Sequence, residues 1–198
     1  MENSIHYVLI LDQSGSMGML KREVISSFNE QLEMIRILQE KDRKYQFKIT
    51  LCRFNDTIDY RFVGEPVKHI EKLNDSDYNP ESCTALYDAI GRSFSITEEL
   101  IKPGDKVFFA IFTDGLENAS TKFRATDIKK ILQSAEEKKW EVKFFCRYED
   151  DHLYRKELDI DKNMAPLTMD DDGLSYMAKE VHFCMCYLAD DGNVDDKN

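Results

Sequence analysis

Five stretches of the chain are apolar over most of their length, which predicts β-strands. They cover residues 7–12, 47–54, 57–63, 107–114 and 142–148. Several are apolar at consecutive positions rather than at alternate ones, as is typical of strands buried on both faces of a parallel sheet. Only Asn55 and Asp56 separate the second stretch from the third, and so short a break predicts a hairpin with one antiparallel strand.

Between these strands, apolar residues recur at intervals of three and four, the spacing of an amphipathic helix. The pattern predicts helices over residues 20–38, 86–100, 125–139 and 174–188. Helices that alternate with strands indicate an α/β fold, a Rossmann-like open sheet that is mostly parallel, with one antiparallel edge strand and helices on both faces. We expect a single domain over residues 1–189 and an acidic, disordered tail at 190–198.

The chain of 198 residues has a formal charge of −11, and its acidic residues are concentrated towards one end. Residues 149–198 contain fourteen Asp or Glu and five Lys or Arg, so they account for −9 of the total. Because such a surface repels polyanions, we expect neither nucleic acid nor an anionic membrane as a partner. No run approaches the ~20 apolar residues of a membrane-spanning helix, and the N-terminus lacks the pattern of a secretion signal, so we expect a cytoplasmic protein.

The five cysteines favour reduced thiols over a disulfide framework, because their number is odd and most of them lie in apolar segments. No CxxC pair is present, which argues against a zinc site built from cysteines.

Polar residues with oxygen-bearing side chains follow two of the predicted strands and precede one helix. They are Asp12, Ser14, Ser16, Thr84 and Asp114. The carboxyl ends of parallel strands meet at one edge of a sheet, so these side chains can converge there. Two carboxylates and three hydroxyls are hard ligands that suit Mg²⁺, or Mn²⁺ as the next choice. With only two carboxylates, such an ion keeps much of its positive charge and attracts an acidic group from outside.

The same residues carry a resemblance to a known family. The stretches are DQSGSMG at 12–18, TALYDAIG at 84–91 and FTDGLENAS at 112–120. In order and spacing they resemble the metal-ion-dependent adhesion site of the von Willebrand factor type A (VWA) domain. The resemblance covers residues 4–189 and is greatest to the small stand-alone versions of bacteria and their phages. It implies that Ser14, Ser16 and Thr84 bind the metal directly, that Asp12 and Asp114 support them, and that a partner's carboxylate takes the open position.

Residues beside these motifs are expected on the rim where a partner docks: Met17, Tyr78, Glu117 and Asn118. The chain departs from the family where many relatives carry glycines before the threonine, since here the sequence is Glu81-Ser82-Cys83. We expect the Cys83 side chain to pack beneath the loop.

The leading hypothesis is an intracellular protein-binding module that captures an acidic residue of a partner through the bound ion. The family resemblance suggests an ATPase, or a stress-response or phage-associated component, as that partner. One alternative is a metal-dependent hydrolase or phosphotransferase on a similar sheet, and another is a scaffold with a vestigial metal site. A third interpretation gives these residues purely structural roles, with Ser14 and Ser16 capping the next helix and Asp114 forming a turn with Gly115.

Catalysis is disfavoured because the sequence lacks its usual motifs. An aspartyl-phosphate enzyme needs a second acid two residues after its nucleophile, and that position is Ser14. Neither GxxxxGK[ST] nor GxSxG is present, and no histidine is placed as a general base. We therefore expect a protein that is not an enzyme.

Overall fold

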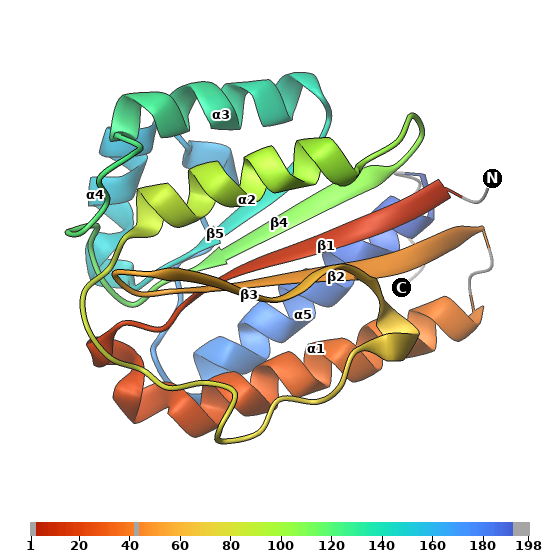
Figure 1. Cartoon of the computed structure of the whole chain (residues 1–198), viewed down its shortest axis with the longest axis horizontal. Coiled ribbons are helices and arrows are strands. Elements are labelled where there is room, and N and C mark those ends of the chain that lie inside the picture. Colours follow the sequence, from red (N-terminus) through yellow and green to blue (C-terminus); the bar gives the residue numbers. More distant parts are fainter. Residues whose placement is uncertain (1–2, 42–43, 192–198) are drawn as a thin grey trace.

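Five strands form one sheet in the order β3-β2-β1-β4-β5 (Figure 1). The computed structural model describes residues 3–41 and 44–191. At the centre, β1 (Asn3–Asp12) runs parallel to β2 (Tyr45–Phe54) and to β4 (Lys106–Phe112). At the two edges, β5 (Glu141–Phe145) is parallel to β4 and β3 (Ile58–Pro66) is antiparallel to β2. The predicted sheet, mostly parallel with one antiparallel edge strand, is confirmed.

The turn between β2 and β3 is held by the side chain of Asn55. Its Oδ1 accepts hydrogen bonds from the backbone N–H of Thr57 at 2.8 Å and from the Thr57 hydroxyl at 2.9 Å. An asparagine that bonds the backbone two residues ahead is a common device of tight turns. The predicted hairpin at this place is therefore confirmed.

Helices cover both faces of the sheet, as predicted. On one face lie α1 (Lys21–Lys41) and α5 (Asp171–Ala189), and on the other lie α2 (Leu86–Leu100) and α3 (Ala125–Glu137) (Figure 1). Short 3₁₀ turns complete the chain: η1 (Gly15–Leu20), η2 (Val67–His69) and η3 (Asp161–Asn163).

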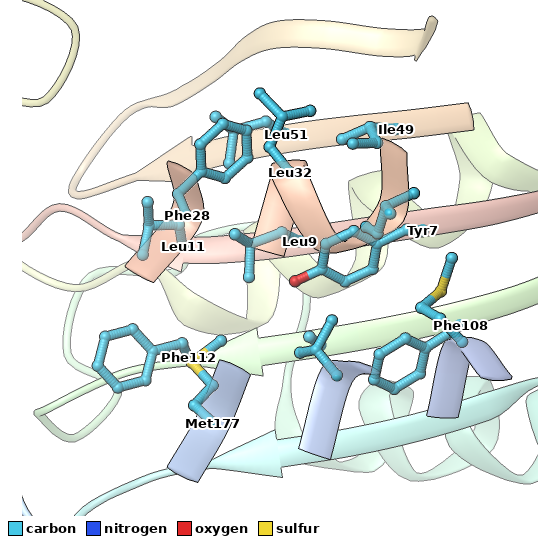
Figure 2. Packing of buried hydrophobic residues seen from close by; sticks show 14 of the residues in the cluster. Tyr7, Leu9, Leu11, Phe28, Leu32, Ile49, Leu51, Phe108, Phe112 and Met177 are labelled. Atoms are coloured by element: carbon cyan, nitrogen blue, oxygen red, sulfur yellow. The ribbon is translucent and has the colours of Figure 1, made fainter. Parts of the chain in front are cut away.

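The central strand shows why the apolar runs are continuous. Alternate residues of β1 point to opposite faces, and both faces are covered. Tyr7, Leu9 and Leu11 pack towards α1 and α5, where Figure 2 shows them against Phe28, Leu32 and Met177. Val8 and Ile10 pack on the opposite side, towards α2. Consecutive apolar residues are thus buried on either side of one strand.

The predicted last strand is wrong at its end. It was expected over residues 142–148, but β5 stops at Phe145 and α4 (Tyr148–Leu158) begins three residues later. In α4 only Asp150, Tyr154 and Leu158 are buried, at intervals of four, and most of its other residues are charged. So narrow a buried stripe gives a weak helical signal, which explains why this helix was missed.

Beyond β5, the chain makes a partial further strand. Single parallel bridges join Phe144 to Met164 and Arg147 to Leu167. Within residues 3–41 and 44–191, no helix is both long and apolar enough to cross a membrane.

The predicted tail begins directly after α5. Its second residue, Asp191, accepts hydrogen bonds from the Tyr45 hydroxyl and from Lys106 Nζ, both at 2.6 Å. The remainder of that predicted tail, 192–198, lies outside the described residues.

Candidate metal site

The candidate site lies where β1 and β4 end. Asp12 is the last residue of β1, and Asp114 follows β4 by two residues. Because Leu11 of β1 pairs with Phe112 of β4 in parallel register, both carboxylates come to the same edge of the sheet. Thr84 reaches this edge from the loop that leads into α2. The carboxyl ends of the strands therefore bring together segments that are distant in sequence.

Direct contacts connect four of the five predicted side chains. Ser16 Oγ donates to Asp114 Oδ1 at 2.5 Å, and Ser14 Oγ lies 3.2 Å from Ser16 Oγ. Asp12 Oδ1 accepts from the backbone N–H of Ser14 at 2.7 Å.

The position of the fifth side chain, that of Thr84, follows from its distance to Gly115. A Cβ atom on Gly115 would lie 3.8 Å from both Ser16 Oγ and Thr84 Oγ1. The Thr84 hydroxyl and the Ser16 hydroxyl therefore both lie against Gly115, next to Asp114, and all five residues reach the same edge of the sheet.

Both carboxylates are buried, which matters for their charge. Asp12 is fully buried, and burial raises its pKa to about 6, although hydrogen bonds from Thr113 and Ser14 oppose the rise. Burial also raises the pKa of Asp114 above its ordinary value, opposed by the hydrogen bond from Ser16 and by the charge of Arg147. Buried acids side by side make a region that a bound cation would stabilise.

The chemistry of the donors fits a hard divalent cation. Among the described residues, no group of three or more His, Cys, Asp or Glu side chains could hold a metal ion. A cation at this edge would therefore use Asp12 and Asp114 together with the hydroxyls of Ser14, Ser16 and Thr84. Oxygen ligands of this kind suit Mg²⁺ and Mn²⁺ better than softer metals.

Solved structures of other proteins share this fold, although no protein-family model and no curated protein matches the sequence. The PilB minor pilin from Streptococcus sanguinis superposes with a TM-score of 0.62 at 8% identity, over 93% of this chain and 62% of that one. A von Willebrand factor type A protein from Catenulispora acidiphila gives 0.57 at 14% identity, over 91% of this chain and 42% of that one. The chain has a VWA-like fold.

A further VWA-like neighbour carries a metal. It is proximal thread matrix protein 1 from the mussel byssus, with a zinc-occupied MIDAS motif, and it superposes with a TM-score of 0.58 at 12% identity. The alignment covers 93% of this chain and 46% of that one. The chain therefore spans less than two thirds of each of these three proteins, and at such identities the likeness shows the fold alone.

Two residues predicted for the partner-binding rim of the VWA-like domain are wrong, because both are fully buried. Met17 has no exposed surface and packs in the core that faces α1 and α5. The 3₁₀ geometry of η1 turns Met17 inward and leaves Met19 93% exposed. Tyr78 also has no exposed surface, and its hydroxyl donates to the backbone oxygen of Asp12 at 2.5 Å. Tyr78 therefore holds the end of β1 in place from within the core.

The other two predicted rim residues hold the loops of the site together. Asn118 is exposed, and its Oδ1 accepts from the backbone N–H of Thr84 at 2.9 Å, while Thr84 O accepts from Asn118 N at 3.0 Å. Glu117 is half-buried, and its carboxylate accepts from the backbone N–H of Tyr87 in the first turn of α2 and from the Ser120 hydroxyl. Thr84 is thus tied to the turn that carries Asp114.

The loop that departs from the family pattern has its own backbone geometry. Ser82 adopts φ of 67°, a left-handed conformation that glycine takes more readily. Ser82 O accepts from the backbone N–H of Gly15 at 3.1 Å, which pins this loop against the serine motif. Cys83 is exposed, so the expectation that it packs beneath the loop is wrong.

Sequence reasoning missed three residues around the site. Thr113 is fully buried, and its hydroxyl donates to Asp12 Oδ2 at 2.6 Å. Asp88 accepts three backbone N–H groups of residues 121–123. Arg147 lies close enough to Asp114 to affect its pKa. Only Thr113 had a sequence signal, since it directly precedes Asp114.

Proposed function

We propose that this domain is a non-catalytic protein-binding module. A divalent ion, Mg²⁺ or Mn²⁺, would be held by Asp12, Ser14, Ser16, Thr84 and Asp114. The ion would capture an acidic residue of a partner protein. The observation that carries the proposal is the convergence of two buried carboxylates and three hydroxyls at one edge of the sheet.

The balance of charge supports capture of an anion. Only two of the five proposed ligands are carboxylates and the other three are neutral hydroxyls, so a divalent ion would keep more positive charge here than at a site rich in acids. Arg147 contributes a guanidinium close to Asp114. A partner carboxylate therefore meets a metal whose ligands do not repel it strongly, next to a positively charged side chain.

Binding rather than catalysis is the better proposal for these residues. The hydroxyls of Ser14, Ser16 and Thr84 would be metal ligands, and none of them lies beside a histidine in the described contacts. The buried His6 is six residues before Asp12 on β1, where it pairs with Asp105 at 3.2 Å. The zinc-occupied MIDAS motif of the mussel protein adds Zn²⁺ to the ions worth testing.

The setting we propose is the cytoplasm, because all five cysteines are free thiols and the family resemblance is to stand-alone bacterial or phage domains. The partner would be a protein that offers a carboxylate, for example an ATPase or another stress-response or phage-associated component. The charge of −11 argues against nucleic acid or an anionic membrane in that role.

The proposal is tested by the proton relaxation of acetate. With the protein in excess over Mn²⁺, the methyl protons of acetate should relax faster than in the metal-free sample, because acetate enters the open position of the paramagnetic ion. Acetamide, a neutral molecule of the same shape, should show a much smaller effect, and EDTA should lower both to the level of the Mn²⁺–EDTA complex alone. Equal relaxation of acetate and acetamide would contradict capture of carboxylates.

A further inference from the structure

A hollow lies at the same end of the molecule as the candidate metal site. Its volume is about 410 Å³, and it is lined by Tyr148, Pro166, Leu167 and Tyr176 together with the polar residues Thr168 and Asp172. Tyr148 begins α4, and Tyr176 lies in the second turn of α5. Figure 1 places the carboxyl ends of the strands, the start of α4 and the start of α5 at one end of the fold. The hollow and the metal site therefore lie at one end of the molecule.

Arg147 is near both the metal site and this hollow, because its charge acts on Asp114 and its neighbour in sequence lines the hollow. The backbone N–H of Thr113 donates to Phe145 O at 3.1 Å, which sets the end of β5 beside the turn that carries Asp114. Arg147 follows Phe145 by two residues and directly precedes Tyr148. The Arg147 side chain is 41% exposed, and its guanidinium is oriented by Asp150, which accepts from Nε at 2.7 Å and pairs with Nη2 at 2.7 Å. An exposed, fixed guanidinium is suited to receive a carboxylate.

The hollow is built from fixed backbone. Leu167 N donates to Cys146 O at 2.9 Å, which ties its floor to the end of β5. The chain at Thr168 packs so closely on α5 that a Cβ on Gly173 would lie 1.8 Å from Thr168 O. Tyr148 and Tyr176 remain 62% and 43% exposed. Two exposed aromatic rings around a fixed floor suit an apolar side chain.

We propose that the partner segment presents an acidic residue beside an apolar one, with the carboxylate between the metal and Arg147 and the apolar side chain in the Tyr148–Tyr176 hollow. This inference rests on the proposed function, since the metal provides the first contact. The occupant is a short extended peptide, because the positively charged guanidinium and the aromatic hollow are adjacent along one edge. The apolar residue would distinguish this partner from other acidic proteins.

The test is selection from a random peptide library displayed on phage. The library is bound to the immobilised protein in Mn²⁺ and released with EDTA, and the most enriched peptide is then synthesised. Its affinity is measured for the native protein, for Tyr148→Ala/Tyr176→Ala and for Phe183→Ala. Phe183 is the matched control, since it is an aromatic residue of α5 that is 55% exposed and lies outside the hollow. Circular dichroism and Mn²⁺ calorimetry report separately whether each variant is folded and binds the ion.

We expect peptides with an acidic residue and an apolar residue close by. Tyr148→Ala/Tyr176→Ala should weaken binding about tenfold or more, while Phe183→Ala binds as the native protein does. Enriched peptides that share only the acidic residue, or an affinity that is the same for the double variant and the native protein, would contradict the role of the hollow. The proposed function would still hold. If EDTA releases no enriched peptide from protein that binds Mn²⁺, both the hollow and carboxylate capture are wrong.

Discussion

Replacing Asp88 by Asn should destabilise the domain markedly, although the two side chains have the same shape. Asp88 lies in the first turn of α2, and its carboxylate accepts the backbone N–H groups of Thr121 at 2.9 Å, Lys122 at 2.9 Å and Phe123 at 2.8 Å. These bonds hold the chain that follows the Asp114 turn against α2. An asparagine side chain has one acceptor oxygen in place of two. Its NH₂ group would therefore face at least one of these backbone N–H groups, donor against donor.

The expected loss follows from these bonds. A hydrogen bond to a charged group contributes about 1.5–3 kcal/mol, and Asn keeps weaker bonds to two of the three N–H groups at best. The negative charge near the start of α2 contributes a further 0.3–1 kcal/mol or so. We therefore expect Asp88→Asn to lower the free energy of unfolding by about 2–4 kcal/mol. Asp75→Asn, a change of the same kind at an exposed position, should stay within about 0.5 kcal/mol of the native protein.

The assay is urea unfolding at several pH values, which also tests the sign of the pKa shift. Burial raises the pKa of Asp88, but the three backbone hydrogen bonds outweigh it and hold the pKa below its ordinary value of 3.8. A carboxyl whose pKa is lower in the folded state stabilises the protein above its unfolded pKa. That contribution is lost as the pH falls through the folded pKa. The difference between native protein and Asp88→Asn should thus be constant at neutral pH and shrink below pH 3.8. A difference under about 0.5 kcal/mol at pH 7, or one that is unchanged in acid, would refute this reasoning.

Two other pairs of variants test the packing. Leu9→Ala, in the centre of β1 with 2% exposure, should cost about 2–5 kcal/mol in urea unfolding, and Met19→Ala, 93% exposed, less than about 0.5 kcal/mol. Equal costs would contradict the described core. Gly173→Ala places a Cβ 1.8 Å from Thr168 O and should cost about 1–3 kcal/mol, whereas Gly18→Ala meets no atom within 4 Å and should be tolerated. A stable Gly173→Ala protein would show that the chain at Thr168 is not packed as described.

The fold could be predicted because its central strands, β1 and β4, are buried on both faces. In β1 the run from Tyr7 to Leu11 is apolar at every position, with Val8 and Ile10 on one side and Leu9 and Leu11 on the other, so it stands out in the sequence. The helix α4 could not be predicted in this way, since Asp150 occupies a buried position that an apolar residue would take in an ordinary helix. The ion pair between Asp150 and Arg147 makes this burial possible, and it leaves no periodic pattern of apolar residues in the sequence.

The candidate site could be predicted only in part, for a similar reason. Asp12, Ser14, Ser16, Thr84 and Asp114 follow strand ends or precede a helix, so the topology alone brings them to one edge. The rim depends on which way each loop residue faces. The assignment of Met17 was wrong because the 3₁₀ turn after Ser14 directs this side chain into the core. Asn118 accepts from the backbone N–H of Thr84 in the loop before α2, and the sequence does not reveal that these two loops meet.

The central claim, that five oxygen-bearing side chains at this edge bind a divalent cation, is tested most directly by calorimetry with Mg²⁺ and Mn²⁺. The native protein should bind one ion, and so should Ser26→Ala, which removes an exposed hydroxyl of α1 away from the site. Ser14→Ala/Ser16→Ala and Asp114→Asn should remain folded and lose that binding. Equal binding by the native protein and these variants, or no binding by folded native protein, would contradict the metal site.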